Sequence, residues 1–238
     1  MKRIILLLFP ILFSCKSDDG KSNGLNRIKT ESHLIDSETA IDTISFFDFF
    51  ENYIFDKKLQ KVNNTIFFSS KDFITYLNHD TLSVFEEKIN SNKQDLIVLD
   101  FKKNKNSIYK FEKIDNKWSF LGSNTILVNT LSENNFVDFL IKFSKDSIYQ
   151  KKHILFPLEN YSLDDDYQTT SQKIEKEEWN HFNLVEEIES LLFLANIDSN
   201  NVFRNIYYRG IDNGILVKLT FKRVNNEWFL VKTEDYST

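Results

Sequence analysis

The chain has 238 residues, a formal net charge of −5 and an aromatic content of 15%, and 23 of its residues are Phe. Mild acidity without a long basic run argues against a nucleic-acid partner, and the apolar content excludes disorder outside the N-terminal stretch. The single cysteine, Cys15, excludes an intramolecular disulfide and any metal site built on several cysteines.

The N-terminus has the pattern of a secretory signal. Lys2 and Arg3 supply positive charge, and residues 4–13 are apolar except for Pro10. A membrane-spanning helix needs about 20 apolar residues, so this run is too short to remain as a transmembrane anchor. We therefore predict a cleaved signal peptide over residues 1–14.

The end of the apolar run predicts a lipid anchor. Leu12-Phe13-Ser14-Cys15 resembles a lipobox, in which the lipid is attached to a thiol after a small residue. We predict that Cys15 is lipidated and holds the mature chain on a membrane outside the cytoplasm, since two or more acyl chains give stable attachment. The following Lys16-Ser17-Asp18-Asp19 resembles the signal by which Bacteroidota send lipoproteins to the cell surface. We expect an outer-membrane lipoprotein on the cell surface, with the periplasmic face as the alternative.

A flexible tether and an internal repeat follow. Residues 15–42 are polar and show no sustained period, which predicts a tether. Beyond it, two segments recur at fixed offsets and in the same order, which indicates a repeat over residues 43–125 and 131–238. Phe46-Phe47-Asp48-Phe49-Phe50 precedes Phe136-Val137-Asp138-Phe139-Leu140 by 90 residues, and the segment 111–118 precedes 221–228 by 110. The second copy therefore carries about twenty extra residues between the two segments, and the region around Trp179 lies in this longer middle.

Each copy reads as helix first and strands afterwards. Phe46, Phe49, Phe50 and Tyr53 recur at i, i+3, i+4 and i+7, which predicts an amphipathic helix. A short helix is expected after Asp80, and a second apolar-periodic segment runs over residues 184–194. Strands are predicted over 96–101, 108–114 and 118–121, and over 202–209, 215–224 and 228–232, with hairpin turns at Asn116-Lys117 and Asn225-Asn226. This order indicates an α+β fold.

The second copy resembles an uncharacterised family of Bacteroidota lipoproteins, the domain of unknown function 4348. The resemblance rests on Asp146-Ser147-Ile148-Tyr149-Gln150, His153-Ile154-Leu155-Phe156-Pro157-Leu158 and Glu178-Trp179-Asn180-His181. Tyr149 and His153 depart from the pattern, which usually has Phe and Arg there. The resemblance implies two tandem NTF2-like domains, each with helices on a curved antiparallel sheet. It implies no activity, and NTF2-like folds host enzymes and binding proteins alike.

Four residues are candidates for lining a ligand cup in the second copy: His153, Trp179, Tyr207 and Arg209. Aromatic rings beside an arginine suit a glycan or a peptide, although sheet packing accounts for them equally well. Gln60 and Gln150 recur in both copies, and we expect them to bridge backbone groups; lining two equivalent cups is the alternative.

These observations favour a non-enzymatic binding or interaction module of unknown ligand, without a metal or a cofactor. Its expected partners are the membrane through the lipid on Cys15, and a glycan, a peptide or an outer-membrane protein. The alternative is a small hydrolase or isomerase that uses a His–carboxylate pair, such as one built on His153 or His79, in one cone.

Overall fold

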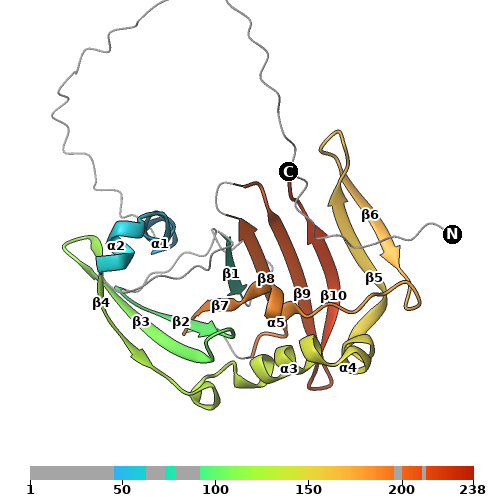
Figure 1. Ribbon diagram of the computed structural model, residues 1–238, viewed down its shortest axis with the longest axis horizontal. Helices are drawn as coiled ribbons and strands as arrows, with labels where there is room; N and C mark the ends of the chain where they lie inside the picture. The colour runs from blue at the N-terminus through green and yellow to red at the C-terminus, as the bar shows by residue number, and fades with distance from the viewer. Residues whose placement is uncertain (1–45, 63–72, 79–91, 196–199, 211–212) are drawn as a thin grey trace, which may run out of the picture. The chain divides into compact units, whose positions relative to one another are not determined.

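The computed structural model describes residues 46–62, 73–78, 92–195, 200–210 and 213–238 (Figure 1). These ranges all belong to one unit, residues 43–238. The predicted signal peptide, Cys15, the tether and the short helix expected after Asp80 lie outside the described residues. Across the described ranges, every helix is too short or too polar to cross a bilayer.

The helices form two similar pairs. The first pair begins at Phe46 and the second at Asn134, and each consists of a longer helix followed at once by a short one. The apolar spacing predicts the longer helix of each pair, and the structure confirms both. The described helices are α1 (Phe46–Phe55), α2 (Lys57–Val62), the 3-10 helix η1 (Val128–Thr130), α3 (Asn134–Lys145), α4 (Ser147–Lys152) and α5 (Leu184–Ile188).

The described strands all join one sheet of ten strands. Its order is β4-β3-β2-β7-β1-β8-β9-β10-β5-β6. Neighbours are antiparallel except for the pairs β1–β7 and β10–β5. The strands are β1 (Phe73–Asn78), β2 (Lys93–Asp100), β3 (Lys105–Ile114), β4 (Lys117–Thr125), β5 (Ile154–Leu163), β6 (Thr169–Ile174), β7 (Ser190–Leu194), β8 (Phe203–Gly210), β9 (Leu216–Val224) and β10 (Glu227–Asp235).

The predicted strands coincide with β2 to β4 and β8 to β10, whereas β1, β5, β6 and β7 were not predicted. The apolar segment 184–194 does not continue as one element. It is helical to Ile188, turns at Glu189 with a backbone φ of 53°, and continues as β7. A positive φ on a residue other than glycine marks a forced change of direction.

The central strands are buried on both faces. In β7, Leu191 and Phe193 belong to one apolar cluster, which we call the α3 core, while Leu192 and Leu194 belong to another, the α1 core. Successive side chains of a strand point to opposite faces, so the two cores lie on opposite sides of the sheet. In β1 all six residues are buried. Strands covered on both faces need apolar residues at every position.

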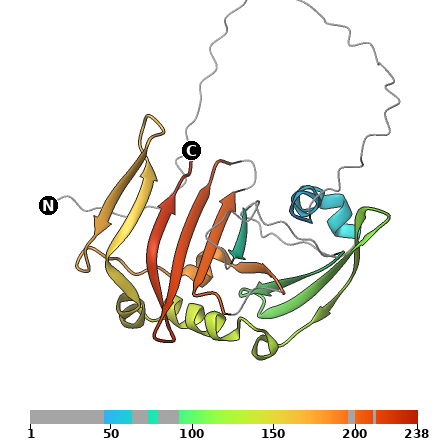
Figure 2. The same cartoon turned by 180° about the vertical axis from the view of Figure 1, so that it is seen from behind.

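The two cores contain the same aromatic arrangement. The ring of Phe46 lies 5.4 Å from that of Phe111 and 5.0 Å from that of Trp118, edge to face in both cases. In the α3 core, Phe136 lies 5.5 Å from one partner ring and 5.0 Å from the other, again edge to face; these partners are Phe221 and Trp228. Figures 1 and 2 show α1 beside β3 and β4, and α3 beside β9 and β10. The residues that recur in the sequence therefore meet in space.

The two predicted repeats are joined through their central strands. β7, from the second copy, pairs with β2 of the first, and β1, from the first copy, pairs with β8 of the second. One continuous sheet therefore runs through both copies, in place of two separate sheets.

Two-sided burial predicts that neighbouring residues of β7 are equally intolerant of truncation. We expect Leu191→Ala and Leu192→Ala each to lower the free energy of unfolding by about 2–5 kcal/mol, because each opens a cavity in a different core. Both side chains are fully buried. Urea unfolding followed by circular dichroism measures the change, with Leu121→Ala on the exposed side of β4 as the control. If one of the two β7 variants were as stable as this control, that face of β7 would not be packed.

Candidate functional site

The junction between α3 and α4 is held by side chains that bond the backbone. The carboxylate of Asp146 accepts hydrogen bonds from the backbone amides of Ile148 and Tyr149 at 3.0 and 2.9 Å and so starts α4. An acidic N-cap of this kind satisfies amides that the helix itself leaves without an acceptor. Gln150, four residues after Asp146 in α4, is fully buried.

Gln150 connects this junction to the segment that contains Trp179. Its amide nitrogen donates to the carbonyl oxygens of Phe143 and Phe182 at 3.0 and 2.8 Å. Its amide oxygen accepts from the indole nitrogen of Trp179 at 3.1 Å and from the backbone amide of Phe182 at 3.3 Å. Both donors and both lone pairs of the amide are thereby used, which fixes the indole relative to α4.

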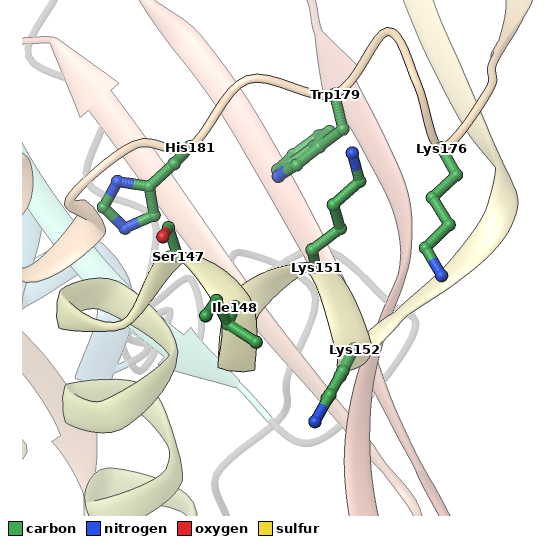
Figure 3. A pocket seen from close by; sticks show the side chains of 7 residues that line it. All are labelled: Ser147, Ile148, Lys151, Lys152, Lys176, Trp179 and His181. Carbon is green, nitrogen blue, oxygen red and sulfur yellow. The ribbon is translucent and has the colours of Figure 1, made fainter.

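A pocket of about 350 Å³ lies between α4 and this segment (Figure 3). We call it the lysine–tryptophan pocket. Figure 3 shows α4 forming one wall and the chain that carries Trp179 and His181 forming the other. The pocket is lined by Ser147, Ile148, Lys151, Lys152, Lys176, Trp179 and His181.

The lining is positively charged and partly apolar. Lys151, Lys152 and Lys176 contribute three ammonium groups, and the lining contains no carboxylate. The ion pairs found in the described part of the chain do not involve these three lysines. Trp179 and the exposed side chain of Ile148 add apolar surface. A pocket of this composition suits an anionic ligand that also has an apolar face.

His181 enters the pocket with one ring nitrogen already engaged. Its Nε2 lies 2.9 Å from the carbonyl oxygen of Ser144. Because a carbonyl oxygen only accepts, Nε2 carries the hydrogen in this contact. The second ring nitrogen, Nδ1, is the one left for a ligand.

His153 is packed between aromatic rings and is not among the residues that line the pocket. Its ring stacks on Tyr149 at 3.8 Å and on Phe229 at 5.4 Å. Its Nδ1 lies 2.8 Å from the carbonyl oxygen of Tyr149, so its ring nitrogen is engaged by the backbone and its ring faces by aromatic side chains. His79, the other histidine considered for a catalytic pair, lies outside the described residues.

Tyr207 and Arg209 lie on the opposite face of the sheet from Trp179. Tyr207 packs into the α1 core and carries the ammonium of Lys218 5.6 Å above its ring. Arg209, two residues further along β8, shares its face and pairs in register with Ile74. Of the four candidates, only Trp179 lines the pocket, and the structure does not bring the other three to it.

Glu234 is the centre of a second polar cluster, on the face that also carries Tyr207. Its carboxylate lies 3.2 Å from the ammonium of Lys218 and 3.1 Å from that of Lys232, and it accepts a hydrogen bond from the hydroxyl of Tyr236 at 3.1 Å. Burial alone would raise the pKa of Glu234, but the two ammonium groups outweigh burial and lower this pKa. Two ammonium groups therefore face one carboxylate, and these ion pairs join β9 and β10 within the sheet.

Tyr208, the neighbour of Tyr207, faces the α3 core. Burial, reinforced by the negative charges of Glu187 and Glu189, raises the pKa of its hydroxyl to about 12. The phenol is therefore neutral at any physiological pH, which makes it a hydrogen-bonding group and not a base.

The prediction for Gln60 and Gln150 was that both bridge backbone groups, and the structure shows such a bond in each. Gln60 donates to the carbonyl oxygen of Tyr53 at 2.9 Å, as Gln150 does to that of Phe143. Sequence reasoning missed the pocket lysines, although Lys151-Lys152 directly follows Gln150. Within the described residues, no group of three or more His, Cys, Asp or Glu side chains is placed to hold a metal ion.

The bonds of Gln150 predict that its removal lowers the stability of the fold and also loosens the indole of Trp179. In Gln150→Ala, the buried carbonyls of Phe143 and Phe182 lose a donor, so we expect a loss of about 1–3 kcal/mol for each group left unsatisfied. Trp179 should also become more accessible to acrylamide quenching. The measurement needs a background in which the two buried tryptophans, Trp118 and Trp228, are replaced by Phe. If quenching of Trp179 were unchanged in a folded variant, Gln150 would not position the indole.

Residues 63–235 match the family described as a domain of unknown function, DUF4348. The match begins within the first predicted repeat and spans all ten described strands. No curated protein matches the chain. Among solved structures, an NTF2-like protein from Bacteroides fragilis is 21% identical, with a TM-score of 0.61, over 85% of this chain and 100% of that one. An NTF2-like protein of unknown function from Shewanella baltica is 16% identical, with a TM-score of 0.27, over 48% of this chain and 98% of that one.

The likeness to the Bacteroides fragilis protein concerns the fold, and it agrees with the predicted NTF2-like architecture. The sheet was predicted to be antiparallel, but it is mixed, because β1 and β7 pair in parallel, as do β10 and β5. The family match agrees with the family that the motifs around Gln150, His153 and Trp179 predict. This chain belongs to the DUF4348 family and has an NTF2-like fold.

Proposed function

We propose that this protein is a lipid-anchored, extracytoplasmic binding module that holds an anionic ligand in its lysine–tryptophan pocket. The observation that carries the proposal is the pocket itself, where three lysines share a lining without carboxylates with an indole held by a buried amide. Lys152 and Lys176 are exposed and Lys151 is part-buried, so all three ammonium groups can reach a ligand in the pocket. Lysines gathered at one concave site therefore favour a ligand that brings the opposite charge.

Binding is favoured over catalysis because the space between α3 and the sheet is filled. Phe136, Phe139 and Phe143 each contact the ring of Phe221 at 5.5–5.8 Å. An NTF2-like enzyme would need an open cup there, with a histidine oriented by a carboxylate. In this chain the same volume is apolar core, and the concave site lies outside it, beyond α4.

The anchor is supported by the sequence alone. The basic start, the short apolar run and Cys15 after Ser14 favour export followed by lipidation. The acidic pair after Cys15 favours the outer membrane and the cell surface over the periplasmic face. We infer from the same features that the source is a member of the Bacteroidota.

We also infer that residues 43–125 and 131–238 are two NTF2-like copies that share one sheet. The matched ring contacts of Phe46 and Phe136 and the matched bonds of Gln60 and Gln150 support this inference. The pocket then belongs to the second copy, because Lys176, Trp179 and His181 lie in its middle part, which is about twenty residues longer than that of the first copy.

Replacing the anchoring thiol tests the location. Cys15→Ala should move the protein from the membrane fraction to the soluble fraction and abolish metabolic labelling with palmitate, because no other cysteine is present. Ser17→Ala, two residues further on, serves as the matched control and should behave as wild type. A Cys15→Ala protein that still fractionated with membranes and incorporated palmitate would overturn the lipoprotein assignment.

Charge reversal tests the pocket. Detergent-solubilised full-length protein should bind dextran sulfate and not unmodified dextran, and binding should weaken as salt rises because exposed charges are screened. The double variant Lys151→Glu/Lys176→Glu should weaken binding by about tenfold or more, since like charges at a binding site cost several kcal/mol. The matched control, Lys58→Glu/Lys117→Glu, changes the net charge equally on exposed positions outside the pocket. Equal losses in the two variants would mean that only net charge matters and that the pocket is not the site.

A further inference from the structure

We propose that the ligand of the lysine–tryptophan pocket is an acidic sugar, a pyranose that carries a carboxylate, with its ring stacked on the indole of Trp179. This inference rests on the proposed anion-binding role of the same pocket and adds the chemical class of the ligand. Three features of the pocket support it: an indole ring held in one orientation, lysine side chains from both walls, and side chains that can form hydrogen bonds (Figure 3).

The orientation of the Trp179 indole is fixed by other residues of the protein. Gln150 accepts a hydrogen bond from the indole nitrogen at 3.1 Å, and Phe182 meets the indole edge to face at 5.7 Å. A second edge-to-face contact, at 6.3 Å, comes from Phe156. A side chain held in one orientation loses little conformational freedom when a ligand binds, and such preorganisation strengthens binding. An ordinary surface tryptophan would not need a fully buried amide to hold it.

The indole presents its ring to the ligand and not its polar group. Its N–H is already donated to Gln150, so the π face and the ring edge are what Trp179 can offer. The face of an aromatic ring carries partial negative charge. One face of a pyranose presents carbon-bound hydrogens that are polarised by the neighbouring oxygens, and such a face is complementary to the indole.

The lysines come from both walls of the pocket. Lys151 and Lys152 are consecutive residues of α4, so their side chains leave the helix about 100° apart, and Lys176 comes from the facing wall. Each lysine is a compact, flexible point charge, which suits a carboxylate in variable geometry, whereas planar bidentate recognition would call for arginine. The hydroxyl of Ser147 and the Nδ1 of His181 add groups that can bond sugar hydroxyls.

The shape of the pocket favours a ring over an acidic peptide. An extended peptide is usually recognised by a sheet edge or a long groove, whereas these walls are a helix and an irregular segment. A volume of about 350 Å³ lies at the small end of small-molecule sites, which range over roughly 300–1,000 Å³. An acidic peptide would engage the lysines alone and would not depend on the indole.

The test compares two polyanions with equal numbers of carboxylates, oligogalacturonate and polyglutamate, on detergent-solubilised full-length protein by isothermal titration calorimetry. We expect oligogalacturonate to bind about tenfold or more tightly than polyglutamate. Trp179→Ala should weaken oligogalacturonate binding by about tenfold, in the range for truncation of a central aromatic contact, and should leave polyglutamate unchanged. Trp179→Phe, which keeps an aromatic ring, should retain most of the affinity. It keeps the inference testable if the alanine variant does not fold.

Three results would overturn the inference. Equal binding of both polyanions, unaffected by Trp179→Ala, would show that the pocket is a general anion site. The proposed function would then stand, and the assignment of an acidic sugar would be wrong. Equal binding of uncharged oligogalactose would show that the carboxylate is not recognised. No binding of either polyanion, together with no binding of dextran sulfate, would remove the proposed function as well.

Discussion

The burial of the central strands on both faces is the constraint on which the rest of the structure depends. Leu191 and Leu192 are both fully buried, and they face different cores. Such strands bury their backbone only when both faces are covered, so helices are needed on each side of the sheet. The α3 core covers one face and the α1 core the other. The position of the pocket follows, because α4 leaves directly from α3 and is tied to it through Gln150.

The parts of the fold that obey local rules could be predicted, and the parts set by distant contacts could not. The helix period placed α1 and α3, and asparagine-rich turns placed the hairpins; Asn225 and Asn226 adopt φ of 50° and 66°, which such turns require. The stretch 184–194 was ambiguous because its apolar residues suit a helix and a strand alike. The break at Glu189 and the insertion of β1 between β7 and β8 depend on pairing with strands that lie about 90 or more positions away in the chain.

Strand alternation shows which residues share a face, but not which core that face meets. It correctly groups Tyr207 with Arg209. A ligand cup in the second copy would need both residues on the face that α3 covers, but both lie on the face of the α1 core. A similar limit hides the buried pair of Glu133 and Arg204, whose atoms meet at 2.6 and 2.8 Å across 71 residues of sequence. Charged residues are seldom fully buried, so the sequence predicts that both side chains are exposed. Their pairing becomes visible only in the folded chain.

The lysine–tryptophan pocket is supported by a side chain that also holds the fold together. Gln60 and Gln150 make the same bond to the end of the preceding helix, at 2.9 and 3.0 Å. Gln150 also holds Trp179 and Phe182, which belong to the segment that forms the wall of the pocket opposite α4. The amide that bonds the end of α3 is therefore also the support of the indole. Because the same side chain secures the helix junction and the indole, the pocket cannot loosen without exposing buried carbonyls, and this coupling keeps it rigid.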